Sequence, residues 1–379
     1  MRMKPNYLAL LTVATTVLFP AVIQPVVAAT DAEASAITQE YDRLHRLWLS
    51  EMRMAPDARA LEVIIKKQPN PGVYGKKLKS LLRADLAQDW TLKYGAWLLK
   101  NDNALRPESQ RALLNAVESH HLASPLVGPF CVAMIHLTNT AELPKPGEPA
   151  QLPLRSRGMK LLEQIKKTNP DAKVQGQAAL AISIMLGSLG DDRRIMEKRI
   201  KNIREAIIKS ANVSVGGVTI AEIARDELFK ISNLSKGRVA PDIVGLDSAS
   251  RPLKLSDFRG KVVMLVFWSS WDAEAGRSLE ILRKIASNKV DKPFMVLGVN
   301  RDSLINLRAL EADRIVTWRN FSDPKQRIAK AYRIGAWPHC MVIDQKGAIQ
   351  YRGNVGAFAD AVASDLLLPK AKAAGVKAP

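Results

Sequence analysis

Residues 255–275 read LSDFRGKVVMLVFWSSWDAEA, and this stretch fixes the architecture of the last third of the chain. Within the run KVVMLVF at 261–267, every residue after Lys261 is apolar and three of them are valine, which is typical of a strand buried on both faces of a sheet. A segment with helical periodicity follows it. Beyond that segment, short apolar runs alternate with further helical segments, so the sequence predicts an α/β region here.

The alternation can be assigned along the whole region. The predicted strands are residues 261–267, 294–299, 316–318, 340–344 and 349–352. The predicted helices are residues 273–286, 303–312, 325–332 and 358–368.

Residues 32–232 follow a different pattern, because apolar side chains recur every three or four positions, as in Leu44, Leu47 and Trp48. Segments rich in proline, glycine and asparagine interrupt this periodicity. The sequence therefore predicts about nine or ten short helices and no convincing strand. We expect an all-α, array-like domain over residues 30–236, although no strict repeat period is present.

Composition limits the class of protein. The chain has 379 residues, 47% of them hydrophobic and 25% charged, which favours two globular domains. The formal net charge is +19, but the basic residues are spread along the chain without a long run. This distribution predicts no nucleic-acid partner and at most a weak attraction to anionic envelope surfaces.

The N-terminus has the pattern of a signal peptide. Arg2 and Lys4 precede an uncharged run at 7–23, and the small residues Ala28 and Ala29 follow. Residues 1–29 are therefore predicted to direct export to the periplasm or cell envelope, with no integral membrane span after their removal. An uncleaved membrane anchor is the alternative, although Pro20 interrupts the run.

The chain contains two cysteines, Cys131 and Cys340. Cys131 lies in the apolar segment FCVAMI at 130–135, which predicts a buried free thiol. A disulfide between the two cysteines stays open at this stage, because their distance in sequence says nothing about their distance in space.

Four motifs in order carry a resemblance to a known family. They are GRVAPDI at 237–243, LSDFRGKVV at 255–263, FWSSW at 267–271, and YRIGAWP at 332–338 followed by MVIDQKG at 341–347. Together they resemble the TlpA-like branch of thioredoxin-fold proteins, which is related to the AhpC/TSA redoxins. The resemblance implies a thioredoxin-like domain over residues 237–369, a tail at 370–379, and a cis-proline at Pro338.

The resemblance also implies which positions carry the family's chemistry. Active members place a Cys-x-x-Cys motif after the FWxxW segment, where the start of a helix stabilises the reactive thiolate. In this chain those positions are Asp272 and Ala275. We therefore predict no catalytic cysteine pair, no cofactor and no metal site, and we expect Asp272 to cap the helix that follows.

Three functions remain open from the sequence. The first is a redox-inactive, protein-binding or scaffolding module of the envelope, with an unidentified protein partner. Its peptide-binding surface would contain Trp271, Glu274, Trp337 and Pro338. The second is a thiol-disulfide oxidoreductase or peroxidase-like antioxidant enzyme that uses Cys340 as a single reactive thiol. The third assigns the function to the helical half. Because only the second of these functions is an enzymatic one, the sequence leaves open whether the chain is an enzyme.

Overall fold

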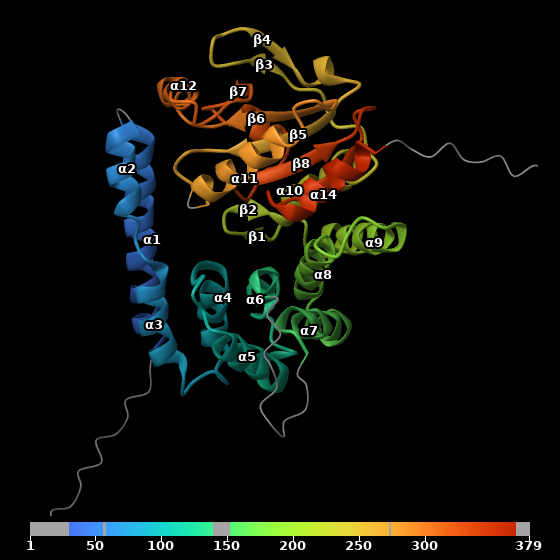
Figure 1. The fold of residues 1–379 in the computed structure, drawn as a ribbon. Coiled ribbons are helices and arrows are strands. Elements are labelled where there is room, and N and C mark those ends of the chain that lie inside the picture. The colour runs from blue at the N-terminus through green and yellow to red at the C-terminus, as the bar shows by residue number, and fades with distance from the viewer. Residues whose placement is uncertain (1–29, 56–57, 139–151, 273, 369–379) are drawn as a thin grey trace, which may run out of the picture.

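The computed structural model describes residues 30–55, 58–138, 152–272 and 274–368, and it separates into a helical region and a region built on a sheet (Figure 1). The predicted signal peptide at 1–29 and the tail at 370–379 lie outside the described residues. Among the helices that the structure describes, none has both the length and the apolar composition needed to cross a membrane.

The N-terminal region is helical, as predicted. Its helices are α1 (Asp31–Met54), α2 (Ala58–Lys66), α3 (Pro71–Leu82), α4 (Leu92–Asn101), α5 (Pro107–Ala116), α6 (Gly128–Ala133), α7 (Leu154–Thr168), α8 (Ala172–Leu186), α9 (Arg193–Ser210) and α10 (Ile220–Asn233). Capping residues in the sequence determine where several of these helices begin. Thr30 and Glu33 form a capping box at α1, and Thr219 and Glu222 form another at α10.

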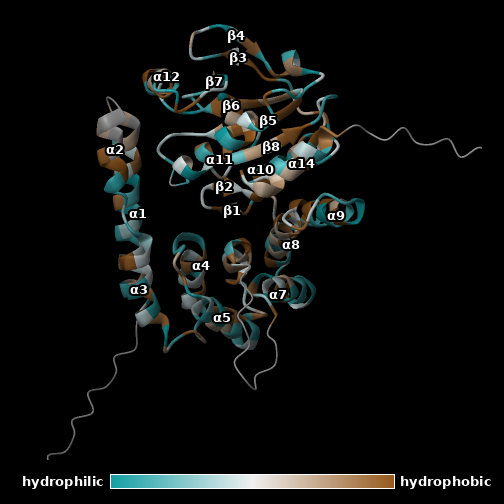
Figure 2. Cartoon of the chain, in the orientation of Figure 1, coloured by the Kyte–Doolittle hydropathy of each residue, from teal (hydrophilic) through white to brown (hydrophobic). Residues whose placement is uncertain are grey.

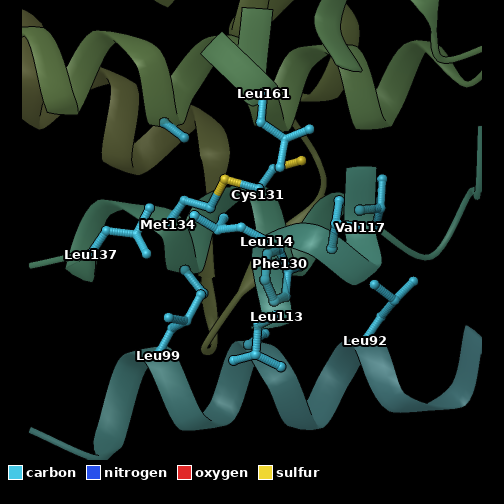
Figure 3. Packing of buried hydrophobic residues seen from close by; sticks show 14 of the residues in the cluster. Leu92, Leu99, Leu113, Leu114, Val117, Phe130, Cys131, Met134, Leu137 and Leu161 are labelled. Carbon is cyan, nitrogen blue, oxygen red and sulfur yellow. The ribbon is translucent and has the colours of Figure 1, made fainter. Parts of the chain in front are cut away.

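The core of this region is assembled from α1 and from α3 to α8. Figure 3 shows Cys131 and Met134 among leucine, valine and phenylalanine side chains that include Leu114, Phe130 and Leu161. Cys131 is a fully buried free thiol, as the sequence predicts. Its burial raises its pKa to about 12.

The prediction that this region lacks strands is wrong at one place. A small antiparallel hairpin joins β1 (Ser214–Val215) to β2 (Val218–Thr219). Gly216 and Gly217 form its turn with φ of 62° and 86°, a conformation that favours glycine. The pair of glycines between two valines was the signal for this hairpin.

The C-terminal region contains a five-stranded sheet in the order β7-β6-β5-β8-β9. Its strands are β5 (Val262–Trp268), β6 (Phe294–Asn300), β7 (Asn320–Ser322), β8 (His339–Ile343) and β9 (Ile349–Gly353). β5, β6 and β7 are parallel, whereas β8 and β9 are antiparallel to their neighbours. β5 lies at the centre and is buried at every position, which explains its unbroken apolar sequence.

Two strand predictions need correction. The strand predicted at 316–318 lies instead at 320–322, because Val316 and Trp318 are buried in the core without joining the ladder. The prediction also missed a hairpin of β3 (Val244–Leu246) and β4 (Pro252–Lys254), whose strands are short and half exposed.

Helices cover both faces of the sheet. One face packs against α11 (Ala275–Ser287), α12 (Leu304–Ala312) and α14 (Ala357–Leu366). The other packs against α13 (Arg327–Ala331) and receives Phe229 and Leu234 from the end of the helical region. An ion pair between Asp226 and Arg333 at 2.7 Å also joins α10 to the sheet region.

Candidate functional site

The candidate site lies where β5 ends and α11 begins. The backbone leaves the sheet at Trp268, passes through Ser269 and Ser270, and reaches Asp272 before α11 starts at Ala275. β6 is parallel to β5, so its own end brings Arg301 and Asp302 to the same edge of the sheet.

Asp272 is held by two groups at this edge. Its carboxylate accepts a hydrogen bond from Arg301 Nη2 at 2.5 Å, and also bonds from the Ser269 hydroxyl at 2.7 Å and the Ser269 backbone N–H at 3.1 Å. The expectation that Asp272 caps α11 is not met. Glu274 occupies the N-cap position without a side-chain capping bond, and the Asp272 side chain turns back toward Ser269 and Arg301.

Arg301 is enclosed by aromatic rings. Its guanidinium carbon lies 3.9 Å from the centre of the Trp271 ring and 4.0 Å from that of the Trp337 ring. This geometry adds cation–π attraction to the ion pair with Asp272. The segment that leads into α11 therefore holds an ion pair whose charges neutralise each other.

Asp302 forms a second, deeper acidic group behind this pair. Its side chain is 2% exposed and accepts hydrogen bonds from the Ser270 backbone N–H at 3.0 Å and from Asn300 at 3.1 Å. Burial raises the pKa of this carboxyl, although these hydrogen bonds oppose the shift.

A groove opens beside the pair of charges. The Trp337–Pro338 peptide bond is cis, as the resemblance implied. Trp337 and Pro338 line a groove of about 740 Å³ together with Glu274 and Ile281 of the α11 segment and Val355 before α14. Ala275 is buried at the start of α11 and does not line the groove.

The structure brings the predicted site residues together in two sets. Glu274, Trp337 and Pro338 share the groove, whereas Trp271 reaches Trp337 through Arg301. Sequence reasoning missed Arg301 and Asp302. Both residues directly follow an apolar strand, and this position in the sequence could have predicted them. The residues that follow neighbouring parallel strands lie at the same edge of the sheet.

Cys340 lies within β8 opposite Val266 of the central strand. It is fully buried and free, and burial raises the pKa of its thiol. Its neighbour His339 has a pKa lowered to about 3 by burial and by the nearby Arg352, so this imidazole is neutral near pH 7. A buried protonated thiol beside a neutral histidine lacks the setting that makes cysteines reactive. The role of Cys340 as a reactive thiol stays a prediction.

The question of a disulfide is answered by the packing. Cys131 belongs to the helical core and Cys340 to the cluster between the sheet and α11, and both thiols are free. Among the residues that the structure describes, no three acidic, histidine or cysteine side chains gather in a way that could hold a metal ion.

Comparison with known proteins finds relatives of the sheet region. Residues 236–352 match the model of the AhpC/TSA family. The thiol-disulfide oxidoreductase ResA of Geobacillus thermodenitrificans is 27% identical over 115 residues, which cover 30% of this chain and 66% of ResA. The thioredoxin-like protein YneN of Bacillus subtilis is 27% identical over 121 residues, which cover 31% of this chain and 70% of YneN. The chain thus spans about two thirds of the length of these curated relatives.

Solved structures are similar over the same region. The thioredoxin domain of a thiol-disulfide oxidoreductase from Bacteroides vulgatus is 26% identical, with a TM-score of 0.33, and the match covers 36% of this chain and all of that domain. A secreted thiol-disulfide isomerase from Corynebacterium glutamicum is 25% identical, with a TM-score of 0.31, over 34% of this chain and 84% of that protein. Residues 236–352 thus match the model of the AhpC/TSA family, and this region has a thioredoxin-like sheet, with helices on both faces and a cis-proline at Pro338.

Proposed function

We propose that this protein is an exported, redox-inactive thioredoxin-fold binding module, which holds an extended protein segment in the groove beside Pro338. The observation that carries the proposal is the ion pair of Asp272 with Arg301. Dithiol exchange needs two thiols one helical turn apart at the start of the helix. This chain has Asp272 and Ala275 there by our alignment, and its two cysteines lie elsewhere in buried positions.

The hydrogen bonds and the burial of Asp272 support this proposal in addition to the absence of a cysteine pair. Its carboxylate is 9% exposed and is already bonded to Arg301 and Ser269. A general base must reach the proton that it removes, and the oxygens of this carboxylate are directed at Arg301 and Ser269. The position is therefore suited to a structural role.

The groove supports the binding half of the proposal. Its apolar lining includes Ile281, Trp337 and Val355, and its rim carries the charged Glu274 and Arg277. An apolar floor with a polar rim is the usual anatomy of a surface that binds a polypeptide. Residues next to a cis-proline present backbone groups that can pair with an extended chain. The proposal of export rests on the sequence pattern of residues 1–29.

Two measurements test the proposal. The first is reduction of insulin disulfides, for which we expect background rates. Turnover comparable to that of a relative with Cys-x-x-Cys would overturn redox inactivity.

The second is binding of a reduced, alkylated and permanently unfolded protein, followed by fluorescence anisotropy. Ala336→Trp fills the groove and should weaken binding about tenfold or more, the effect expected when a central interface contact is blocked. Ala312→Trp adds the same bulk at an exposed position of α12 outside the groove, and should leave binding unchanged. Equal binding by both variants would show that the groove is not the binding surface.

A further inference from the structure

The outer face of α9 is a basic surface that the function proposed above does not use. Arg194, Lys198, Lys201, Arg204 and Ile208 recur every three or four positions, so they project from one side of the helix. All five are exposed. We call this set the basic face of α9, and Figure 2 shows the helix as largely hydrophilic at the edge of the helical region.

The opposite side of α9 is occupied by the protein itself. Ile203 packs in a cluster with Ala224 and Ile231 of α10, and Ala206 packs against Ala179 and Leu180 of α8. The buried Arg199 is paired with Glu227 at 3.1 Å. Helix α9 is therefore fixed in orientation, and its basic face is presented outward as a rigid surface.

The cations of this face lack internal neutralisation. Two carboxylates lie on the same side of α9, and each already has a partner: Glu197 pairs with Arg193 at 2.9 Å and Glu205 pairs with Lys209 at 2.7 Å. Within the described part of the chain, no ion pair is formed by Arg194, Lys198, Lys201 or Arg204. Four cations without an ion-pair partner, spread over about three turns of a helix, create a local positive potential, to which the net charge of +19 adds.

An apolar residue lies within this field. The Ile208 side chain is 82% exposed, although isoleucine is among the residues most often buried. Ile208 is one of the residues that line a shallow depression along the helix, together with Glu197, Ile200, Lys201, Arg204, Glu205 and Lys209. A soluble polyanion gains nothing from contact with isoleucine, whereas the boundary between lipid headgroups and acyl chains accepts both the cations and the apolar side chain.

We propose that the basic face of α9 docks this protein onto the surface of an anionic lipid bilayer. The phosphate groups of acidic lipids would meet Arg194, Lys198, Lys201 and Arg204, while Ile208 enters the interface between them. Each Lys or Arg held near an anionic membrane surface contributes about a fivefold increase in affinity. Four such residues with one shallow apolar contact give reversible binding that weakens as salt increases.

The test is co-sedimentation of the full chain with vesicles of phosphatidylcholine, alone and with phosphatidylglycerol added. The readout is the increase in bound protein that phosphatidylglycerol causes, because any contribution of the apolar run at 7–23 is common to both vesicles. We expect a clear increase that falls with added salt. No increase with phosphatidylglycerol would overturn the proposal.

Variants locate the effect. Reversal of three charges, Arg194→Glu with Lys198→Glu and Lys201→Glu, should reduce the phosphatidylglycerol-dependent binding about tenfold or more. The matched control reverses three exposed charges of the sheet region, Lys325→Glu with Arg327→Glu and Lys346→Glu. An equal loss in the control would show that net charge alone drives binding, and would overturn the assignment to α9.

A third variant separates lipid from soluble polyanion. Ile208→Ser should weaken binding to anionic vesicles several-fold and leave the weaker binding of heparin unchanged. If Ile208→Ser has no effect on vesicles, and heparin competes at the same affinity, the face binds a soluble polyanion and the lipid proposal fails. All these positions are exposed, so unchanged thermal unfolding is the expected check on folding.

Discussion

Asp272 and Arg301 lie 29 positions apart in sequence, yet their carboxylate and guanidinium are 2.5 Å apart in the structure. Their side chains are 9% and 12% exposed, so the pair is largely withdrawn from water. Removal of one partner from such a pair costs more than the pair contributes, because the remaining charge stays desolvated.

Asp272→Asn should therefore lower the free energy of unfolding by about 1–3 kcal/mol. Chemical denaturation is the measurement. Glu197→Gln, in the exposed pair with Arg193, is the matched control and should change stability by about 0.5 kcal/mol or less. A loss at Asp272 no larger than that of the control would mean that Arg301 is already satisfied by its two tryptophan rings.

Arg301 should also affect a thiol that is introduced at position 272. In Asp272→Cys with Ala275→Cys, Arg301 would lie beside the first thiol and favour its thiolate. We expect measurable insulin reduction, and a pKa for that thiol below the ordinary value of about 8.5, read from the pH dependence of alkylation. Addition of Arg301→Met should raise that pKa.

The control for the restored protein is Asp272→Ser with Ala275→Ser, which places hydroxyl groups where the double cysteine variant has thiols and should stay inactive. A folded restored protein without reductase activity would show that the geometry at the start of α11, and not merely the chemistry, differs from that of active relatives.

Cys340 should resist modification in the folded protein. It is fully buried in β8, and burial raises the pKa of its thiol, so little thiolate is available to react. We expect no labelling by iodoacetamide and no sulfenic acid with dilute peroxide at pH 7, and complete labelling in urea. Mass spectrometry of the digested protein separates Cys340 from Cys131. Rapid native labelling of Cys340, lost in Cys340→Ser, would instead favour the single-thiol enzyme.

Asp302 should make stability depend on pH. Its folded pKa is raised, first by burial, above the unfolded value of about 3.9. A raised carboxyl pKa contributes stability that is present below the unfolded pKa and is lost as pH rises through the folded pKa. Asp302→Asn cannot ionise, so its stability relative to the natural protein should improve as pH increases from about 3 to about 7.

Urea unfolding at several pH values measures this change, and Asp313→Asn at an exposed position is the matched control. If the Asp302 variant instead loses stability relative to the natural protein over this range, the hydrogen bonds from Ser270 and Asn300 outweigh burial.

We expect α10 to unfold together with the sheet. Phe229 of α10 packs in the sheet cluster, and the Arg333 guanidinium carbon lies 4.6 Å from the centre of its ring. Phe229→Ala should cost about 1–3 kcal/mol and speed amide exchange in β5 and β8. Ile305→Ala, at a side chain 82% exposed on α12, should leave exchange unchanged. Unaltered exchange in the Phe229 variant would place the domain boundary after α10.

The sequence predicted the architecture well where the signal is local. The central strand and the helix after Trp271 follow from periodicity, which acts over a few residues, whereas the cis bond at Pro338 was implied by the family resemblance. The boundaries of the edge strand were wrong for the same reason. Apolar Val316 and Trp318 imitate a strand, while the true strand begins at Asn320, whose side chain accepts a hydrogen bond from Trp268 Nε1 at 3.0 Å.

The amino-acid sequence by itself determines that no cysteine pair follows FWSSW and that Asp272 comes directly after it, since these are facts of residue order. What Asp272 does there could not follow from that order. Its partner Arg301 directly follows the neighbouring parallel strand β6, and Trp337 lies in the segment before β8. An ion pair and an aromatic enclosure need atoms within a few ångströms, and only the folded sheet brings residues so distant in the chain to one edge.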